Sequence, residues 1–245
     1  MTNNCVLILG ATSDIARETA KIYAKNGYDL VLAARNSEAA KLDVNNLRLR
    51  YKVNVKCIYF DVENYSSYAH LFSRIGDSLL GVISFVGYLG NQEISQNNFI
   101  ELKRVVEVNF TGVVSVLEKA ADYFEHKKNG FIVGVGSVAG DRGRKSNYIY
   151  GASKGALEIY FSGLRNRLTS SGVHVLLVKP GFVDTKMTKN IDLPPLLTSR
   201  PDEIALDIYK AQQNGKNTIY SKWFWQFIMF IIKYIPENIF KKTNI

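Results

Sequence analysis

Continuous apolar runs alternate with amphipathic stretches along most of the chain. The run CVLILG from Cys5 is continuously apolar, which is typical of strands covered on both sides of a parallel sheet, and the run VHVLLVKPG from Val173 is also predicted to be a strand. From residue 14 onward apolar side chains recur at helical spacing until Asn26-Gly27, a typical helix end. The pattern predicts strands over 5–10, 28–35, 55–62, 79–87, 130–137 and 173–181, a short last strand over 217–220, and helices over 14–26, 37–51, 65–75, 97–124, 148–170 and 201–213.

This order of elements predicts an α/β fold, with one doubly wound parallel sheet and helices on both of its faces. A length of 245 residues is normal for a single domain of this class. The sequence has no stretch of linker composition, so we expect one domain over residues 1–220, followed by an apolar and basic tail over 221–245 that is not a separate domain. Ligands of such sheets bind beyond the carboxyl ends of the strands, and the segments that follow each strand are where chemistry is expected.

Composition narrows the possible partners. The net charge of +9 allows nucleic acid, an anionic membrane, or an anionic cofactor and substrate. Lysine and arginine are spread along the chain rather than concentrated in one patch, which argues against nucleic acid. Two cysteines in apolar runs and three scattered histidines give no metal-ligand spacing, so no metal is expected. Free thiols without a signal peptide indicate a reducing cytoplasm.

A glycine turn joins the first predicted strand to the first predicted helix, in the sequence Gly10-Ala11-Thr12-Ser13-Asp14-Ile15. Such a turn lets backbone N–H groups approach a pyrophosphate, although an ordinary strand–turn–helix without a ligand would read the same way. We expect Gly10, Thr12, Ser13, Asp14 and Ile15 to bind a dinucleotide. The Asp14 carboxylate would repel a phosphate if it pointed inward, and would favour the helix N-terminus if it pointed to solvent.

The second strand predicts which nicotinamide cofactor binds. An acidic residue at its end would accept hydrogen bonds from the ribose of NAD. This chain has Arg35 there instead, and a guanidinium can pair with the 2′-phosphate of NADP(H). The sequence therefore favours NADP(H), although a surface arginine that only caps the strand would look the same.

The strongest chemical signal is a serine, a tyrosine and a lysine. Ser137 ends the fifth predicted strand, and Tyr150 and Lys154 are four residues apart on the next helix, so that they share a face. A free tyrosine has a pKa of about 10, and a nearby ammonium group should lower it. Ser137 could hold a substrate oxygen near the phenol, and Tyr150 could then donate or accept its proton.

From Cys5 to about Tyr220 this constellation resembles the short-chain dehydrogenase/reductase family, which implies a Rossmann-type fold. By that resemblance Asn109 would hold a water that relays protons through Lys154, and Lys154 would also bond the nicotinamide ribose. Family members are usually dimers or tetramers, so the resemblance implies a homo-oligomer. It also implies further cofactor contacts: Asp61 at the adenine amino group, Val62 under the adenine ring, Gly87 at a close backbone approach, and Pro180, Val183 and Thr185 around the nicotinamide.

Two segments depart from the family pattern. The family usually has glycines where Asp14 and Ala16 stand, and the sequence Ser84-Phe85-Val86-Gly87 stands where the family often has Asn-Asn-Ala-Gly. The first departure puts the binding of a phosphate at the turn in doubt. The second weakens the assignment of any specific cofactor contact at residues 84–87, except the close backbone approach at Gly87.

The tail, SKWFWQFIMFIIKYIPENIFKKTNI, is apolar and basic. Its apolar run is too short to span a bilayer, so it either packs on protein or lies in a membrane interface. The phosphate turn together with this tail resembles the branch of the family that reduces decaprenylphosphoryl-2-keto-erythro-pentose, a lipid-linked keto sugar. That resemblance implies a lipid-linked carbonyl substrate and a peripheral location at the inner face of a membrane, and the segment 186–200 would shape the substrate mouth.

Three hypotheses follow. The first is an NADPH-dependent oxidoreductase that reduces a ketone, or oxidises a secondary alcohol, on a lipid-linked sugar or another small molecule. The second is an NADP-binding or membrane-interaction module without turnover, which the altered phosphate turn and the apolar tail would suit. The third is a structural subunit that lends its tail to an enzyme partner.

Overall fold

The computed structural model describes residues 4–189 and 191–243 and contains a seven-stranded sheet in the order β3-β2-β1-β4-β5-β6-β9. All neighbouring strands in it are parallel. The strands are β1 (Cys5–Leu9), β2 (Asp29–Ala34), β3 (Val55–Tyr59), β4 (Leu79–Ser84), β5 (Gly130–Val135), β6 (Val173–Pro180) and β9 (Thr218–Ser221), and the short strands β7 (Phe182–Val183) and β8 (Thr198–Ser199) pair with each other outside the sheet.

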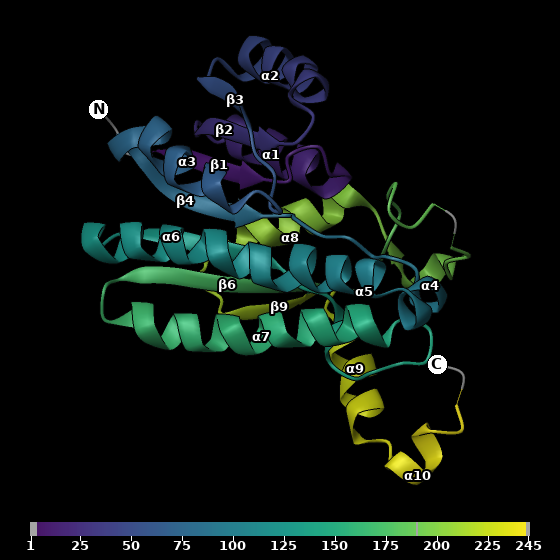
Figure 1. Cartoon of the computed structure of the whole chain (residues 1–245). Helices are drawn as coiled ribbons and strands as arrows, with labels where there is room; N and C mark the ends of the chain where they lie inside the picture. Colours follow the sequence, from purple (N-terminus) through teal and green to yellow (C-terminus); the bar gives the residue numbers. More distant parts are fainter. Residues whose placement is uncertain (1–3, 190, 244–245) are drawn as a thin grey trace.

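Helices cover both faces of the sheet, as predicted (Figure 1). On one face α3 (Tyr68–Ile75), α6 (Gly112–Lys127) and α7 (Tyr148–Thr169) enclose one apolar core, and on the other α1 (Asp14–Lys25), α2 (Ser37–Tyr51) and α8 (Pro201–Gln213) enclose a second. The central strands β1 and β4 contribute side chains to both cores, which explains their unbroken apolar sequences. The fold is therefore the doubly wound, Rossmann-type sheet that the sequence predicts.

The predicted helical region over about 97–124 is present, but it is divided. The region holds α4 (Gln92–Asn97), α5 (Phe99–Val106), a π-helical turn (Glu107–Thr111) and α6. The break between α4 and α5 comes at Asn98, whose side chain accepts hydrogen bonds from the backbone N–H groups of Ile100 and Glu101 and so begins a new helix. The π turn contains the buried Asn109, whose side chain bonds the neighbouring loop at Tyr88.

Residues 65–75 also differ slightly from the single predicted helix. A 3₁₀ turn (Tyr65–Ser67) precedes α3 there. Such turns are common at the N-terminal ends of helices.

The tail folds into α9 (Phe224–Tyr234) and α10 (Glu237–Phe240), which extend away from the sheet beyond one end of α7 (Figure 1). One face of α9 buries Trp225, Met229 and Ile232, which cluster with Val138 in the loop after β5. The Arg142 guanidinium donates hydrogen bonds to the last carbonyls of α9 and forms an ion pair with Glu237. The tail thus packs on the body of the protein. The last two tail residues, 244 and 245, lie outside the described residues.

Two negative findings apply only to the residues that the structure describes. Within 4–189 and 191–243, no helix is both long and apolar enough to cross a bilayer. In the same ranges, no cluster of histidine, cysteine and acidic side chains has the grouping of a metal site.

Gly181→Ala should loosen the attachment of α9. A methyl group there would stand 1.9 Å from the Cε2 atom of Trp225, whose side chain is only 2% exposed and has little room to move. Overpacking of this kind costs about 1–3 kcal/mol, which should lower the melting temperature by about 2–12 °C. Gly163→Ala on the open side of α7 is the control, because its methyl group meets nothing within 4 Å and should be neutral or stabilising. Calorimetry measures both, and equal melting temperatures for the two variants would show that α9 is not held at Gly181.

Candidate active site

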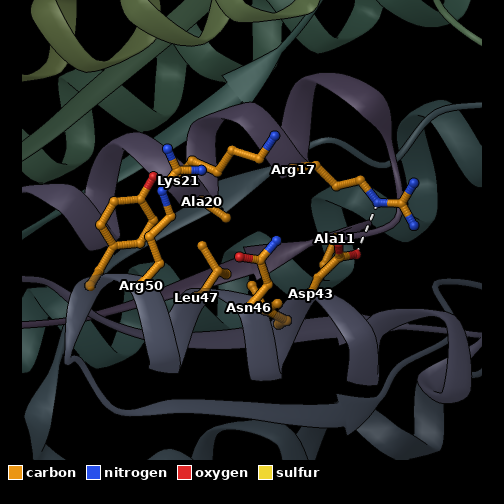
Figure 2. Close-up of a pocket in the computed structure, with 10 residues that line it drawn as sticks. Ala11, Arg17, Ala20, Lys21, Asp43, Asn46, Leu47 and Arg50 are labelled. Carbon is orange, nitrogen blue, oxygen red and sulfur yellow. Dashed lines mark hydrogen bonds and ion pairs between the residues drawn. The ribbon is translucent and has the colours of Figure 1, made fainter.

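A cavity of about 510 Å³ lies at the carboxyl ends of β1, β2, β4, β5 and β6. Most of the residues that the sequence singles out line it: Gly10, Thr12, Ser13, Asp14, Ile15, Arg35, Val62, Gly87, Ser137, Tyr150, Lys154, Pro180, Val183 and Thr185. A second hollow, between α1 and α2, is closed by the Arg17–Asp43 ion pair and has only about 20 Å³ (Figure 2). That is room for about one water molecule, so of these two hollows in the described part of the chain the larger one is the candidate site for a nucleotide.

Gly10 shapes the turn at one end of this cavity. Its φ of +73° lies in the left-handed region, and an added Cβ would stand 3.1 Å from the carbonyl carbon of Phe85. Both the backbone conformation and the close approach to the end of β4 therefore favour glycine. The Ser13 side chain is not used as a cap for α1, so the first N–H groups of α1 remain available for an anion.

The sequence suggests that the Asp14 carboxylate points either inward toward a phosphate or outward to solvent, and the observed position lies between these two. Its carboxylate accepts a hydrogen bond of 2.8 Å from the Lys186 backbone N–H, and the Lys186 ammonium group lies 3.8 Å from the other oxygen. The Asp14 carboxylate thus connects α1, across the mouth of the cavity, with the loop after β7. Lys186 offsets part of its charge, which reduces the repulsion that a phosphate at the start of α1 would meet.

Arg35 follows β2 and lies on the cavity wall with 61% of its side chain exposed. Its guanidinium is 3.7 Å from Glu63, and Arg104 lies 3.8 Å from the same carboxylate. Two arginines therefore share one acidic partner at this end of the cavity. The Arg104 guanidinium also lies over the Tyr88 ring, 4.7 Å from its centroid.

Three residues were expected near the adenine and the neighbouring backbone. Val62 is buried and Gly87 is partly exposed, and both line the cavity. Asp61 is not part of its wall. Its Oδ1 accepts a hydrogen bond from the Glu63 backbone N–H, so it stabilises the turn after β3.

The structure brings Ser137, Tyr150 and Lys154 together at the other end of the cavity. Ser137 follows β5, and its hydroxyl accepts a hydrogen bond from Ala139. Lys154 is 4% exposed, its ammonium group donates to the Val135 carbonyl, and it lies 5.8 Å from the centroid of the Tyr150 ring. The predicted i, i+4 pairing of tyrosine and lysine is thus present on α7.

Burial controls the protonation of both groups. It raises the pKa of Tyr150 to about 12, with the Ser137 hydroxyl acting in the opposite direction, and it lowers the pKa of Lys154 to about 8. The sequence predicts a lowered tyrosine pKa, and this expectation is wrong for the ligand-free protein because desolvation of the phenolate dominates. At neutral pH the phenol therefore holds its proton.

Asn109 lies behind the cavity rather than on its wall. It is fully buried, its Oδ1 accepts from the Tyr88 N–H, and its Nδ2 donates to the Tyr88 and Val105 carbonyls. A Cβ built at Gly87 would stand 3.4 Å from the Asn109 oxygen and 3.6 Å from the Lys154 ammonium group. Asn109 and Lys154 are therefore neighbours on either side of Gly87.

The segment after β6 closes the cavity opposite α1. Pro180 ends β6, Val183 is buried in β7, and the Thr185 N–H donates to the Thr188 hydroxyl. The predicted mouth segment 186–200 contributes Lys186, Met187 and other residues to the wall. Residue 190 of that segment lies outside the described residues.

Several wall residues were missed by the sequence reasoning, among them Tyr88, Arg104, Arg144 and Asn147. Arg104 lies inside a predicted helix and carries no local signal. Arg144 was noted only as part of a basic cluster, and only its position between Ser137 and Tyr150 could have placed it near the site.

Comparison with known proteins places this arrangement in a family. The short chain dehydrogenase family profile matches residues 4–195. An uncharacterized oxidoreductase of Mycobacterium tuberculosis (strain H37Rv) is 30% identical over 241 residues, which cover 97% of this chain and 96% of the relative. One of Streptomyces coelicolor is 29% identical over 241 residues, 97% and 94% of the two chains.

Solved structures agree on the fold. A short-chain dehydrogenase from Sphingobium yanoikuyae in complex with NADPH superposes with a TM-score of 0.83, at 24% identity over 96% of this chain and 97% of the other. A 7beta-hydroxysteroid dehydrogenase superposes with a TM-score of 0.85, at 17% identity over 97% and 95%. The sequence matches extend over nearly the whole chain, and the chain therefore belongs to the short-chain dehydrogenase family of oxidoreductases.

Proposed function

We propose that this protein is an NADP(H)-dependent oxidoreductase that reduces a ketone, with Ser137, Tyr150 and Lys154 as its catalytic set. The observation that carries this proposal is that these three side chains line the same cavity as the Gly10–Ile15 turn and Arg35. The start of α1 would hold the phosphates of a dinucleotide, and Pro180, Val183 and Thr185 would border its nicotinamide. Asp61 is the proposed partner of the adenine amino group, and it would have to turn toward the cavity from the turn after β3 to bond it.

The side chains of the proposed catalytic set have different tasks. NADPH supplies the hydride when it is bound. The Ser137 hydroxyl donates a hydrogen bond to the substrate carbonyl oxygen, and Tyr150 gives that oxygen its proton. The raised pKa of Tyr150 suits a proton donor at neutral pH, and the buried Lys154 ammonium group stabilises the phenolate left behind. Lys154 also bonds the nicotinamide ribose, and Asn109 holds a water that returns the proton.

The preference for NADP(H) rests on Arg35. Its exposed guanidinium lies at the end of β2 beside a second arginine, and a 2′-phosphate can bind both. The solved neighbour from Sphingobium yanoikuyae, described as a complex with NADPH, supports the same choice.

The substrate is a carbonyl compound linked to a lipid, and α9 brings the enzyme to a membrane surface in the cytoplasm. The side of α9 that does not touch the protein is also apolar: Trp223, Phe227, Phe230, Ile231 and Tyr234 are each at least 62% exposed. Their spacing of three and four residues makes one stripe along the helix. The exposed Lys233, Lys241 and Lys242 in the same segment suit an anionic lipid surface. The working form is a homo-oligomer, a dimer or tetramer, as is usual in the family.

Tyr150→Phe should lower kcat for ketone reduction by about a hundred- to ten-thousand-fold, because the proton donor is lost. Binding of NADPH, followed by nicotinamide fluorescence, should persist in this variant. Tyr148→Phe, which changes an exposed tyrosine on the first turn of the same helix, is the matched control and should retain full turnover. Undiminished turnover by the Tyr150 variant would refute the catalytic assignment.

Arg35→Ala should weaken NADPH binding by about ten- to a hundred-fold and leave NADH binding nearly unchanged, because only NADPH carries the 2′-phosphate. Fluorescence titration with each cofactor measures both dissociation constants. Lys41→Ala removes another cation whose side chain is 61% exposed, on the adjacent helix, and should change neither constant. Equal losses for the two cofactors in the Arg35 variant would contradict a role at the 2′-phosphate.

Phe227→Ser combined with Phe230→Ser should weaken sedimentation with phosphatidylglycerol vesicles about tenfold or more, since each phenyl ring would otherwise be buried in the lipid interface. Phe99→Ser removes an equally exposed ring, 74% accessible, from α5 and should leave vesicle binding intact. If the wild-type protein does not sediment with these vesicles at all, the membrane assignment is wrong.

A further inference from the structure

A buried arginine stands on the wall of the cavity without an oxygen partner. Arg144 lies in the loop between Ser137 and α7 and is only 9% exposed. Among the described residues, its guanidinium has a single hydrogen-bond partner, the Met229 sulfur atom at 3.1 Å, and its Nε has none. A thioether is a weak acceptor, so the guanidinium keeps most of its capacity for hydrogen bonds.

The carboxylates nearby are already engaged. Asp141 is paired with Lys179 and accepts a hydrogen bond of 2.7 Å from the Tyr220 hydroxyl. Glu158 is bound to Lys179 at 2.8 Å.

The acidic group of α10 is engaged as well. Glu237 forms its ion pair with Arg142 rather than with Arg144. The charge of Asp141 favours the charged state of Arg144 at a distance, while burial lowers the pKa of the arginine. Asp141 thus balances the charge of Arg144 in part, but apart from the weakly accepting Met229 sulfur atom no acceptor among the described residues bonds the guanidinium.

A second unpartnered polar group belongs to the same loop. The Asn147 side-chain oxygen is buried without a hydrogen-bond partner, and Asn147 also lines the cavity. Its backbone N–H donates to the Arg144 carbonyl at 3.1 Å, which ties the two residues into one turn. An amide can present either its N–H₂ or its oxygen to a ligand after rotation of its end group. Two residues of one loop that line the cavity therefore each hold a buried polar atom, Arg144 Nε and Asn147 Oδ1, without a hydrogen-bond partner among the described residues.

This part of the cavity is separate from the region assigned to the 2′-phosphate of the cofactor. Arg35 follows β2, whereas Arg144 follows β5, and β1 and β4 lie between these strands. Three strand spacings amount to roughly 14 Å. Arg144 also contacts Met229 of α9, which lies beyond β5 on the side away from β2. The guanidinium is therefore at the part of the cavity wall where α9 packs, away from Arg35.

We propose that Arg144 and Asn147 form a subsite for an oxyanion, a phosphate or a carboxylate, that belongs to the carbonyl substrate. The charge-assisted hydrogen bonds of such a group would satisfy the guanidinium Nε, and the Asn147 amide would donate to the same group. The subsite lies between Tyr150 and α9, so it selects substrates whose acidic group is on the α9 side of the carbonyl. This inference rests on the proposed function, because it assigns a substrate feature to the same cavity.

The test compares paired ketones with NADPH as the reductant. The first pairs are linear oxo acids of graded chain length and their methyl esters, and a further pair is dihydroxyacetone phosphate and dihydroxyacetone. For the wild-type protein we expect kcat/KM to be about ten- to a hundred-fold higher for at least one acidic member than for its neutral partner. Whether the carboxylate or the phosphate pair shows the larger ratio identifies the oxyanion.

Arg144→Met should abolish that ratio, while turnover of the neutral ketones falls far less. Arg144→Lys keeps the charge without the planar set of donors and should restore part of the ratio. Lys145→Met removes the adjacent exposed cation and should leave the ratio unchanged, which separates a direct contact from a general effect of charge. NADPH titration of each variant checks that it is folded.

An acidic-to-neutral ratio near one across all pairs, or one that survives Arg144→Met, would overturn the subsite while the proposed reductase stands. If no ketone is reduced, the proposed function is wrong. The subsite is then tested by ligand binding instead of turnover. In that case the same oxo acids and dihydroxyacetone phosphate are titrated into the NADP-loaded protein by calorimetry. Binding that is present in the wild-type protein and lost in the Arg144→Met variant supports the subsite, and absence of binding to the wild-type protein overturns it.

Discussion

The close approach of α7 to the turn after β5 is the constraint on which the catalytic geometry depends. A Cβ at Gly151 would stand 2.7 Å from the Ala139 carbonyl oxygen, and one at Gly140 would stand 2.8 Å from the Gly155 backbone nitrogen. Only backbone fits between helix and turn at these points. Because the two backbones touch, Ser137 at the start of the turn lies beside Tyr150 and Lys154 on the helix. A single added methyl group at any of these glycines would push apart the three side chains of the proposed catalytic set.

The fold could be predicted because its signals are local. The strand β1 is an unbroken apolar run, β6 is apolar apart from His174 and Lys179, and the predicted span of α8 agrees with the observed one from Pro201 to Gln213. The division of the region after β4 could not be predicted in the same way. Asn98 begins a new helix and Asn109 bonds a distant loop, and in sequence both read as ordinary polar positions on one amphipathic helix.

The site was predictable to the extent that its residues follow strands or share a helical turn. Gly10, Arg35 and Ser137 each follow a strand, and the topology alone brings them to one edge of the sheet. Arg104 and Arg144 reach the cavity through tertiary packing, so no spacing rule identifies them. The protonation of Tyr150 was misjudged for a related reason. Burial of the phenol depends on everything packed around it, whereas the charge of Lys154 is visible in the sequence.

The tail packs on the protein through one side of α9 and leaves an apolar stripe exposed on the other side. Trp225, Met229 and Ile232 lie on one side of α9 and pack on the protein, while Phe227 and Phe230 lie on the other side and remain exposed. A helix that is apolar all round needs a partner on each side. The protein supplies the first partner, and Arg142 fixes the helix end through three backbone carbonyls. Because Met229 on the inner side contacts Arg144, the same helix links the exposed stripe to the wall of the cavity. A ligand with an acidic group at Arg144 and an apolar extension toward the stripe would therefore contact the two parts of the molecule that its own side chains leave without partners.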